Sequence, residues 1–150
     1  MDADVSTPLV VVGSLVVGLV LFFAAATGFL RLGCTAASRI GVYAGKYEPF
    51  APPGVRTSLG IVLAAVIVLS LAGSATEPLI RWLAAYVDER PLRATASALE
   101  WIFYAMLVAA GIGAAQKIER RMALLAATLH SSLLLGAGLA LNVLIRTIVR

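Results

Sequence analysis

The sequence predicts an all-α protein: a bundle of four transmembrane helices with a short interfacial amphipathic helix. Of its 150 residues, 61% are hydrophobic and only 13% are charged, whereas a soluble domain is about half apolar and a quarter charged. The apolar residues also gather in four runs of about 20 residues, the length that a helix needs to cross a bilayer. These two observations exclude a soluble globule, a disordered chain and a nucleic-acid-binding arm.

We expect one integral membrane domain over residues 1–150, with membrane helices at 8–43, 57–76, 93–116 and 121–148. The first run, from Pro8 to Leu30, contains no charged residue, and Pro8 suits the first turn, where its missing N–H is not needed. The stretch 48–54 holds three prolines, which remove backbone donors, so it predicts a non-helical connection.

A short helix is also predicted over 78–88, between the second and third runs. Pro78 fits the first helical position. Trp82 and Tyr86 are four residues apart and so share a helix face. We therefore expect this segment to lie along the membrane interface.

The basic residues predict the orientation. The first and third connections carry seven of them: Arg31, Arg39, Lys46, Arg56, Lys117, Arg120 and Arg121. The opposite side carries five: Arg81, Arg90, Arg93, Arg146 and Arg150. Because cytoplasmic loops are enriched in Lys and Arg, both termini are predicted to lie outside, in what we expect to be a bacterial inner membrane.

Small residues repeat at four-residue steps, and this spacing allows membrane helices to approach closely. The predicted packing positions are Gly18 and Gly28 in the first helix, Ala105, Ala109 and Gly113 in the third, and Ser132, Gly136 and Ala140 in the fourth. Two interpretations stay open: the stripes pack the four helices of one chain together, or one of them meets another subunit.

His130 and Asn142 are the strongly polar side chains of the fourth run, 12 residues or roughly 18 Å apart along a helix. We interpret His130 as an imidazole bonded to a hydroxyl or carbonyl of a neighbouring helix; a haem ligand or a proton-responsive group are the alternatives. Asn142 and Arg146 share one face. Together with His130 they are the candidate polar residues that face a pore or the lipid.

Groups that could perform chemistry are sparse. The sequence contains no Ser/His/Asp set, phosphate-binding loop or metal-binding motif. Coupled transport usually needs an acidic residue in the membrane, and all eight acids are predicted at helix ends or in loops, with Glu100 at the interfacial end of the third run. We therefore expect neither an enzyme nor an ion-coupled pump, and no cofactor or metal.

The C-terminal third carries a resemblance to a known family. The segments 93–99, 101–107 and 134–142 look like the last two membrane helices of the small-conductance mechanosensitive channel family. In that family the final helix is rich in Gly and Ala and lines a heptameric pore. By position, the resemblance implies that Gly136, Gly138 and Ala140 form the close-packed seam of a pore helix, with Asn142 near the pore lining.

Two functions follow as expectations. The first is a non-catalytic polytopic membrane subunit that packs through its small-residue faces into a larger complex. The alternative is a small homo-oligomeric, mechanosensitive-like ion channel whose fourth helix lines the pore. The expected partners are membrane lipids and other membrane subunits or copies of the chain itself. Nucleic acid is not expected, because the basic residues are scattered rather than gathered in a patch.

Overall fold

The computed structural model describes residues 6–148, with side chains from residue 10 onward, and this part of the chain is all-helical. The helices are α1 Ser6–Tyr43, α2 Val55–Leu83, α3 Glu89–Gln116 and α4 Arg120–Ile148. Each is long and apolar enough to cross a membrane. The prediction of an all-α chain with four such helices is confirmed. Arg150, which was counted for the orientation, lies outside the described residues.

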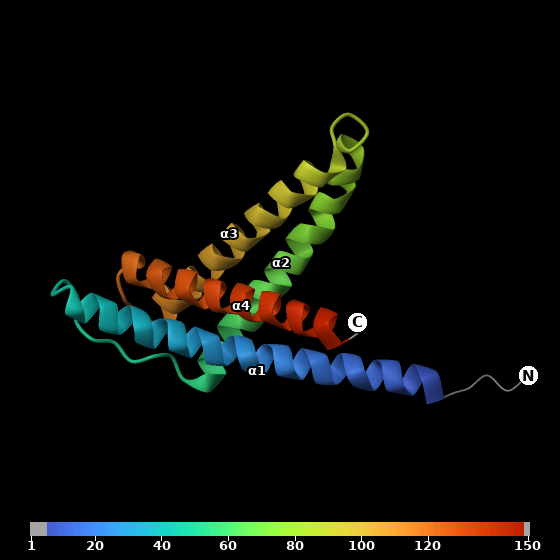
Figure 1. The fold of residues 1–150 in the computed structure, drawn as a ribbon. Coiled ribbons are helices and arrows are strands. Elements are labelled where there is room, and N and C mark those ends of the chain that lie inside the picture. Colours follow the sequence, from blue (N-terminus) through green and yellow to red (C-terminus); the bar gives the residue numbers. More distant parts are fainter. Residues whose placement is uncertain (1–5, 149–150) are drawn as a thin grey trace, which may run out of the picture.

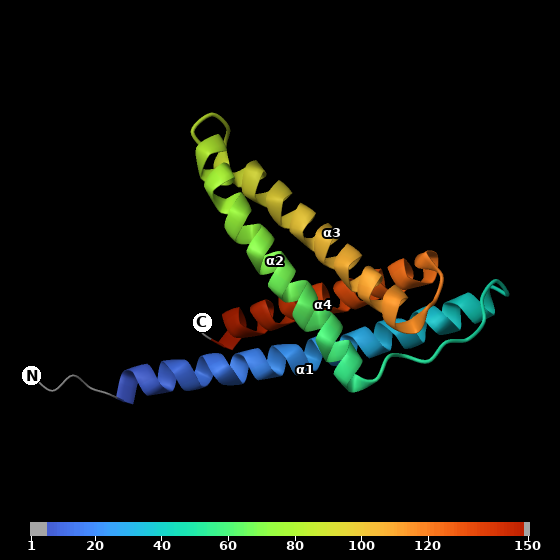
Figure 2. The same ribbon diagram turned by 180° about the vertical axis from the view of Figure 1, so that it is seen from behind.

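The helices form two antiparallel pairs, α1 with α4 and α2 with α3 (Figure 1). Contacts between α3 and α4, and between α1 and the first part of α2, join the pairs. In both views the α2–α3 pair then runs away from the α1–α4 pair (Figure 2). The four helices therefore meet along only part of their length.

The core lies in that shared part, near the connections 44–54 and 117–119. Its most buried apolar residues are Ala26, Leu30, Cys34 and Ala37 of α1, Val62 and Ala65 of α2, Tyr104, Val108, Ala109 and Ile112 of α3, and Met122, Ala123, Ala126 and Ala127 of α4. The steps of three and four residues are those of helices packed along a seam. Every residue at 10–22 of α1 and 135–148 of α4 is exposed. We call these two stretches the unpacked segments.

Two glycines set how closely the helices approach. A Cβ on Gly33 would lie 2.8 Å from the carbonyl oxygen of Ala126 and 3.0 Å from the backbone nitrogen of His130. A Cβ on Gly111 would lie 2.8 Å from Cγ2 of Ile61. The α1–α4 and α2–α3 crossings thus depend on positions that lie outside the stripes predicted from the sequence.

The separate helix predicted over 78–88 is not present, because α2 continues through Pro78 to Leu83 and residues 84–87 form the turn. An interior proline removes its own N–H from the helical ladder and crowds the carbonyl of residue i−4, which destabilises a helix without always ending it. The apolar run of α2 also extends on both sides of Pro78, and an ion pair spans the next turn. Trp82 and Tyr86 still lie together, with ring centroids 5.4 Å apart.

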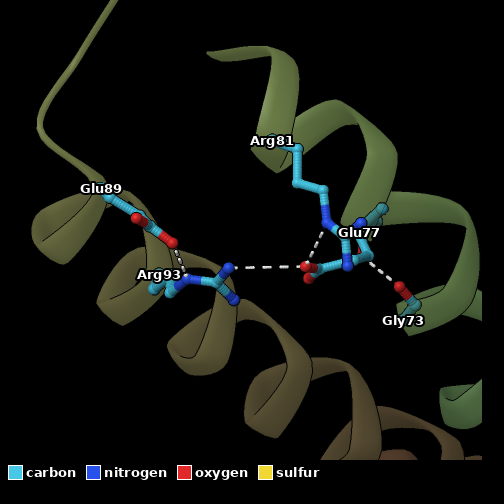
Figure 3. Close-up of polar contacts among 6 residues, drawn as sticks. Gly73, Glu77, Arg81, Glu89 and Arg93 are labelled. Atoms are coloured by element: carbon cyan, nitrogen blue, oxygen red, sulfur yellow. Dashed lines mark hydrogen bonds and ion pairs between the residues drawn. The ribbon is translucent and has the colours of Figure 1, made fainter. Parts of the chain in front are cut away.

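The α2–α3 turn is closed by charged side chains (Figure 3). The Glu77 carboxylate accepts hydrogen bonds from Nε of Arg81, at 3.0 Å, and from Nη2 of Arg93, at 3.4 Å; Arg93 also pairs with Glu89. The Glu77–Arg81 pair spans one turn of α2, and Arg93 extends it across to α3. Because these groups are exposed, each pair contributes little to stability, but together they link the two helices at their far end.

Candidate functional site: a cavity where the helix pairs diverge

A cavity of about 300 Å³ lies at the point where the two helix pairs separate. All four helices line it: Phe22 from α1, Val66 and Leu69 from α2, Glu100, Trp101 and Tyr104 from α3, and Leu134 from α4. Most of this lining is apolar or aromatic, with one carboxylate among it. Pockets of this kind, mainly apolar with a few polar groups, are the usual form of a small-molecule site.

Glu100 also borders a second cavity of about 300 Å³, which runs between α2 and α3 past Gly73 toward Leu83. The half-buried carboxylate lies close to α2, since a Cβ on Gly73 would be 3.6 Å from its Oε1. No basic side chain lines either cavity, and no described residue forms a hydrogen bond or ion pair with the carboxylate. Glu100 therefore lies between two apolar spaces without a counter-charge from the described part of the chain.

The sequence placed Glu100 at the interfacial end of its run, and the structure gives its position within the helix. Helix α3 begins at Glu89 rather than at residue 93, so Glu100 lies 11 residues, about 16 Å, inside the helix. Its neighbour Gly73 belongs to the uncharged run 57–76 of α2. Glu100 therefore stands beside an uncharged stretch of α2 rather than at the end of α3.

Two aromatic rings of α3 stand beside this carboxylate. Trp101 and Tyr104 both line the cavity, and their ring centroids are 6.0 Å apart in an edge-to-face arrangement. Tyr104 is one helical turn from Glu100, and it begins the buried stripe that continues to Val108 and Ile112. This four-residue spacing was visible in the sequence and would have placed Glu100 beside the buried face rather than at a surface.

A buried hydrogen bond lies beneath the cavity. The Tyr104 hydroxyl and Nε2 of His130 are 3.0 Å apart, with 4% and 0% of the two residues exposed. The interpretation of His130 as a ring bonded to a hydroxyl of a neighbouring helix is confirmed. The ring is not exposed at the surface of the chain, because His130 is fully buried. Its Nε2 is already engaged, which leaves Nδ1 as the nitrogen without a partner among the described residues.

The predicted packing positions divide into two groups. On α3, Ala109 is buried, Ala105 is half-buried, and a Cβ on Gly113 would lie 3.8 Å from Cβ of Ala123. This stripe packs inside the chain. The remaining positions do not: Gly18, Gly28 and Gly136 have nothing within 4 Å of an added Cβ, and Ser132 and Ala140 are exposed.

The remaining polar candidates lie on the unpacked part of α4. Asn142 and Arg146 are both exposed. The Asn142 side chain forms no hydrogen bond with another described residue, and neither side chain lines a cavity described above. The structure thus separates them from His130, with which the sequence had grouped them.

A larger groove, of about 660 Å³, lies elsewhere, between α1 and the first half of α2. Its walls are almost wholly apolar; Arg31 stands in its lining, and the hydroxyl of the buried Thr27, which also lines it, has no hydrogen-bond partner among the described residues. Such a groove suits lipid chains, whereas the cavity at Glu100 offers a charge and aromatic rings together.

Within residues 10–148, no three His, Cys, Asp or Glu side chains are grouped closely enough to hold a metal ion. Cys34 is a buried free thiol in the core. The chemistry that the cavity can perform is therefore the binding of a cation by a carboxylate and aromatic faces. Searches against protein families, curated proteins and solved structures find no match for this chain.

Proposed function

We propose that this chain is a non-catalytic membrane subunit that docks onto other membrane helices through its unpacked segments. One observation supports this most directly. The small-residue positions Gly18 and Gly136 lie on these segments and have open space where a Cβ would be. The α3 stripe packs inside the chain, as do Ala123 and Ala127 of α4, whereas Gly18, Gly136 and Ala140 do not.

Exposed apolar side chains alone would not support a docking surface, because lipid tails solvate them as well as a neighbouring helix does. The polar side chain of Asn142, on the unpacked segment of α4, also supports docking. In hydrocarbon an amide needs a hydrogen-bond partner, and no described residue supplies one to Asn142. A helix of another subunit, packed closely over Gly136 and Ala140, would provide both van der Waals contact and that hydrogen bond.

The alternative function is a homo-oligomeric, mechanosensitive-like channel in which α4 lines the pore. The exposure of the whole seam favours it, since Gly136, Gly138 and Ala140 remain free to meet another copy. Asn142 and Arg146 would then face the pore from adjacent turns. Both functions use α4 as the docking helix. They differ in what packs against it, which is a different membrane protein for the docking subunit and another copy of this chain for the channel.

We place the protein in a bacterial inner membrane with both termini outside. The excess of basic residues on the first and third connections, seven against five, supports this orientation. A reporter fused after Arg150 should be active outside the cytoplasm. A reporter active only in the cytoplasm would reverse the assignment.

The docking surface can be tested with Gly136→Leu and a matched control, Gly60→Leu. Both glycines have open space around an added Cβ, so neither substitution clashes inside the chain. The tagged proteins are purified from their own membranes in mild detergent, and their masses are measured by native mass spectrometry. We expect Gly136→Leu to lose the partner mass and Gly60→Leu to retain it.

The composition of the complex then separates the two functions. Different proteins at fixed stoichiometry, with no conductance in planar bilayers, support the docking subunit. A ring of identical chains that conducts ions supports the channel. A monomer for the unsubstituted chain, or equal loss of partners in both variants, contradicts docking through α4.

A further inference from the structure

We propose that the cavity at the divergence of the helix pairs binds a small organic cation of the alkyl- or arylammonium class, with Glu100 as its counter-charge. This inference goes beyond the docking function and does not depend on it. It is based on three features of the cavity: an unpaired carboxylate, two aromatic rings and a lining to which all four helices contribute.

The carboxylate requires a positive partner. Removing an ionised carboxylate from water costs several kcal/mol unless it is paired, and acids at membrane depth are accordingly rare and functional. Arg93 lies on the same helix as Glu100 and forms ion pairs within the α2–α3 hairpin. Its partners are Glu77 and Glu89 at the far end of the hairpin, not Glu100. No basic side chain lines either cavity beside Glu100, so a cationic ligand is the partner that we assign to it.

The walls select the kind of cation. Trp101 and Tyr104 line the same cavity as the carboxylate, and cations with alkyl groups bind over aromatic faces. A divalent metal ion would need several oxygen ligands. Here there is one carboxylate, and the Tyr104 hydroxyl is already bonded to His130. For an organic cation, one carboxylate is enough to neutralise the charge, and the apolar walls can pack against its organic substituents.

The size of the cavity also favours a small molecule over a partner helix. About 300 Å³ is the lower end of the range for small-molecule pockets, and a helix with its side chains is about 10 Å across. Residues of all four helices line the space, and a partner could occupy it with one long basic side chain. That arrangement is the competing outcome in the experiment.

The probe is benzyltrimethylammonium, and its neutral isostere is neopentylbenzene. The chain carries two tryptophans, Trp82 and Trp101. In a Trp82→Phe variant the tryptophan fluorescence comes from Trp101 alone, and it therefore reports on the cavity. The isolated chain is placed in lipid nanodiscs and titrated with the probe. We expect a saturable change in emission that excess neopentylbenzene does not reverse.

The decisive variant is Glu100→Gln, and its matched control is Glu77→Gln at the hairpin tip. Loss of the counter-charge should raise the Kd of the probe about tenfold or more, whereas Glu77→Gln should leave it unchanged. Glu100→Asp retains the charge and should bind the probe more tightly than Glu100→Gln does. This comparison keeps the test valid if the glutamine variant is poorly folded.

Three results would overturn the proposal. One is equal binding of the probe by Glu100→Gln and the unsubstituted chain, and another is displacement of the probe by the neutral isostere. The third is binding that disappears when the chain is purified with its membrane partners attached, which would assign Glu100 to a partner's lysine or arginine. Failure of docking through Gly136 changes none of these measurements on the isolated chain, so the two proposals fail separately.

Discussion

Replacement of Gly33 by alanine tests how closely α1 and α4 must pack. The new Cβ would lie 2.8 Å from the carbonyl oxygen of Ala126 and 3.0 Å from the backbone nitrogen of His130. Both atoms belong to the backbone, so no side chain can rotate away. To reach ordinary contact at 3.4 Å, the two helices must separate by about 0.6 Å, the difference between 3.4 and 2.8 Å.

The energetic consequence follows from the residues along this crossing. Leu30, Cys34 and Ala126 are fully buried there, and a gap of 0.5–1 Å forfeits roughly a quarter to a half of each contact energy. Overpacking of a core typically costs about 1–3 kcal/mol. We therefore expect Gly33→Ala to lower the free energy of unfolding by about 2 kcal/mol.

Gly28→Ala is the matched control on the same helix. Nothing lies within 4 Å of its added Cβ, and alanine is favoured over glycine in a helix by up to about 1 kcal/mol. Its stability should stay equal or rise slightly. Reversible unfolding in mixed micelles, followed by circular dichroism, measures the difference between the two variants, which we expect to be about 2–3 kcal/mol. Equal stability of both would refute the close crossing at Gly33.

Three further predictions concern buried and exposed polar groups. Tyr104→Phe should cost about 1–3 kcal/mol in the same unfolding assay, because it leaves Nε2 of His130 buried without its partner; adding His130→Leu should recover part of that loss, and an unchanged stability for Tyr104→Phe would contradict the bond. Thr27→Val should stabilise the fold by about 1 kcal/mol, because the Thr27 hydroxyl lacks a partner, whereas Thr35→Val, whose hydroxyl bonds to the Arg31 carbonyl at 2.9 Å, should not. The hydrogen bond from Arg81, aided by Arg93, holds the pKa of Glu77 below its ordinary value of 4.5; a depressed pKa stabilises the folded state above pH 4.5 and loses that effect as the pH falls through the folded-state value. Amide protection factors at residues 77–93, that is, the intrinsic exchange rate at each pH divided by the observed rate, should therefore fall below pH 4.5, and Glu77→Gln should remove this step.

Much of the fold could be predicted because it depends on local composition. Lengths of uncharged sequence determined the four helices, and the prolines at 49–53 determined the connection after α1. The predicted break at Pro78 failed because one missing donor does not end a helix whose apolar run continues on both sides. Helix ends near Glu89 and Leu83 depend on how α2 meets α3, which no local pattern contains.

The candidate site was harder to predict, because it depends on which helices touch. Four-residue steps of small residues marked smooth faces, but they could not say that α3 packs inside the chain while α4 leaves Gly136 open. Likewise, Glu100 was one charge near the end of an apolar run. Only the antiparallel pairing of α3 with α2 places it beside Gly73 and at the meeting point of four helices.

The close crossing and the proposed cation site are physically linked, and this gives a last prediction. His130, whose backbone touches Gly33, is bonded to Tyr104, and Tyr104 lines the cavity with Glu100. A 0.6 Å displacement of α4 at Gly33 would therefore shift the Tyr104 ring through its hydrogen bond to His130. The aromatic wall of the cavity would then be less well ordered. Gly33→Ala should weaken binding of benzyltrimethylammonium by a few-fold at temperatures where it remains folded, and Gly28→Ala should not. If Gly33→Ala binds the probe as the unsubstituted chain does, the cavity is formed by α2 and α3 independently of the α1–α4 crossing, and the four-helix description of the site is wrong.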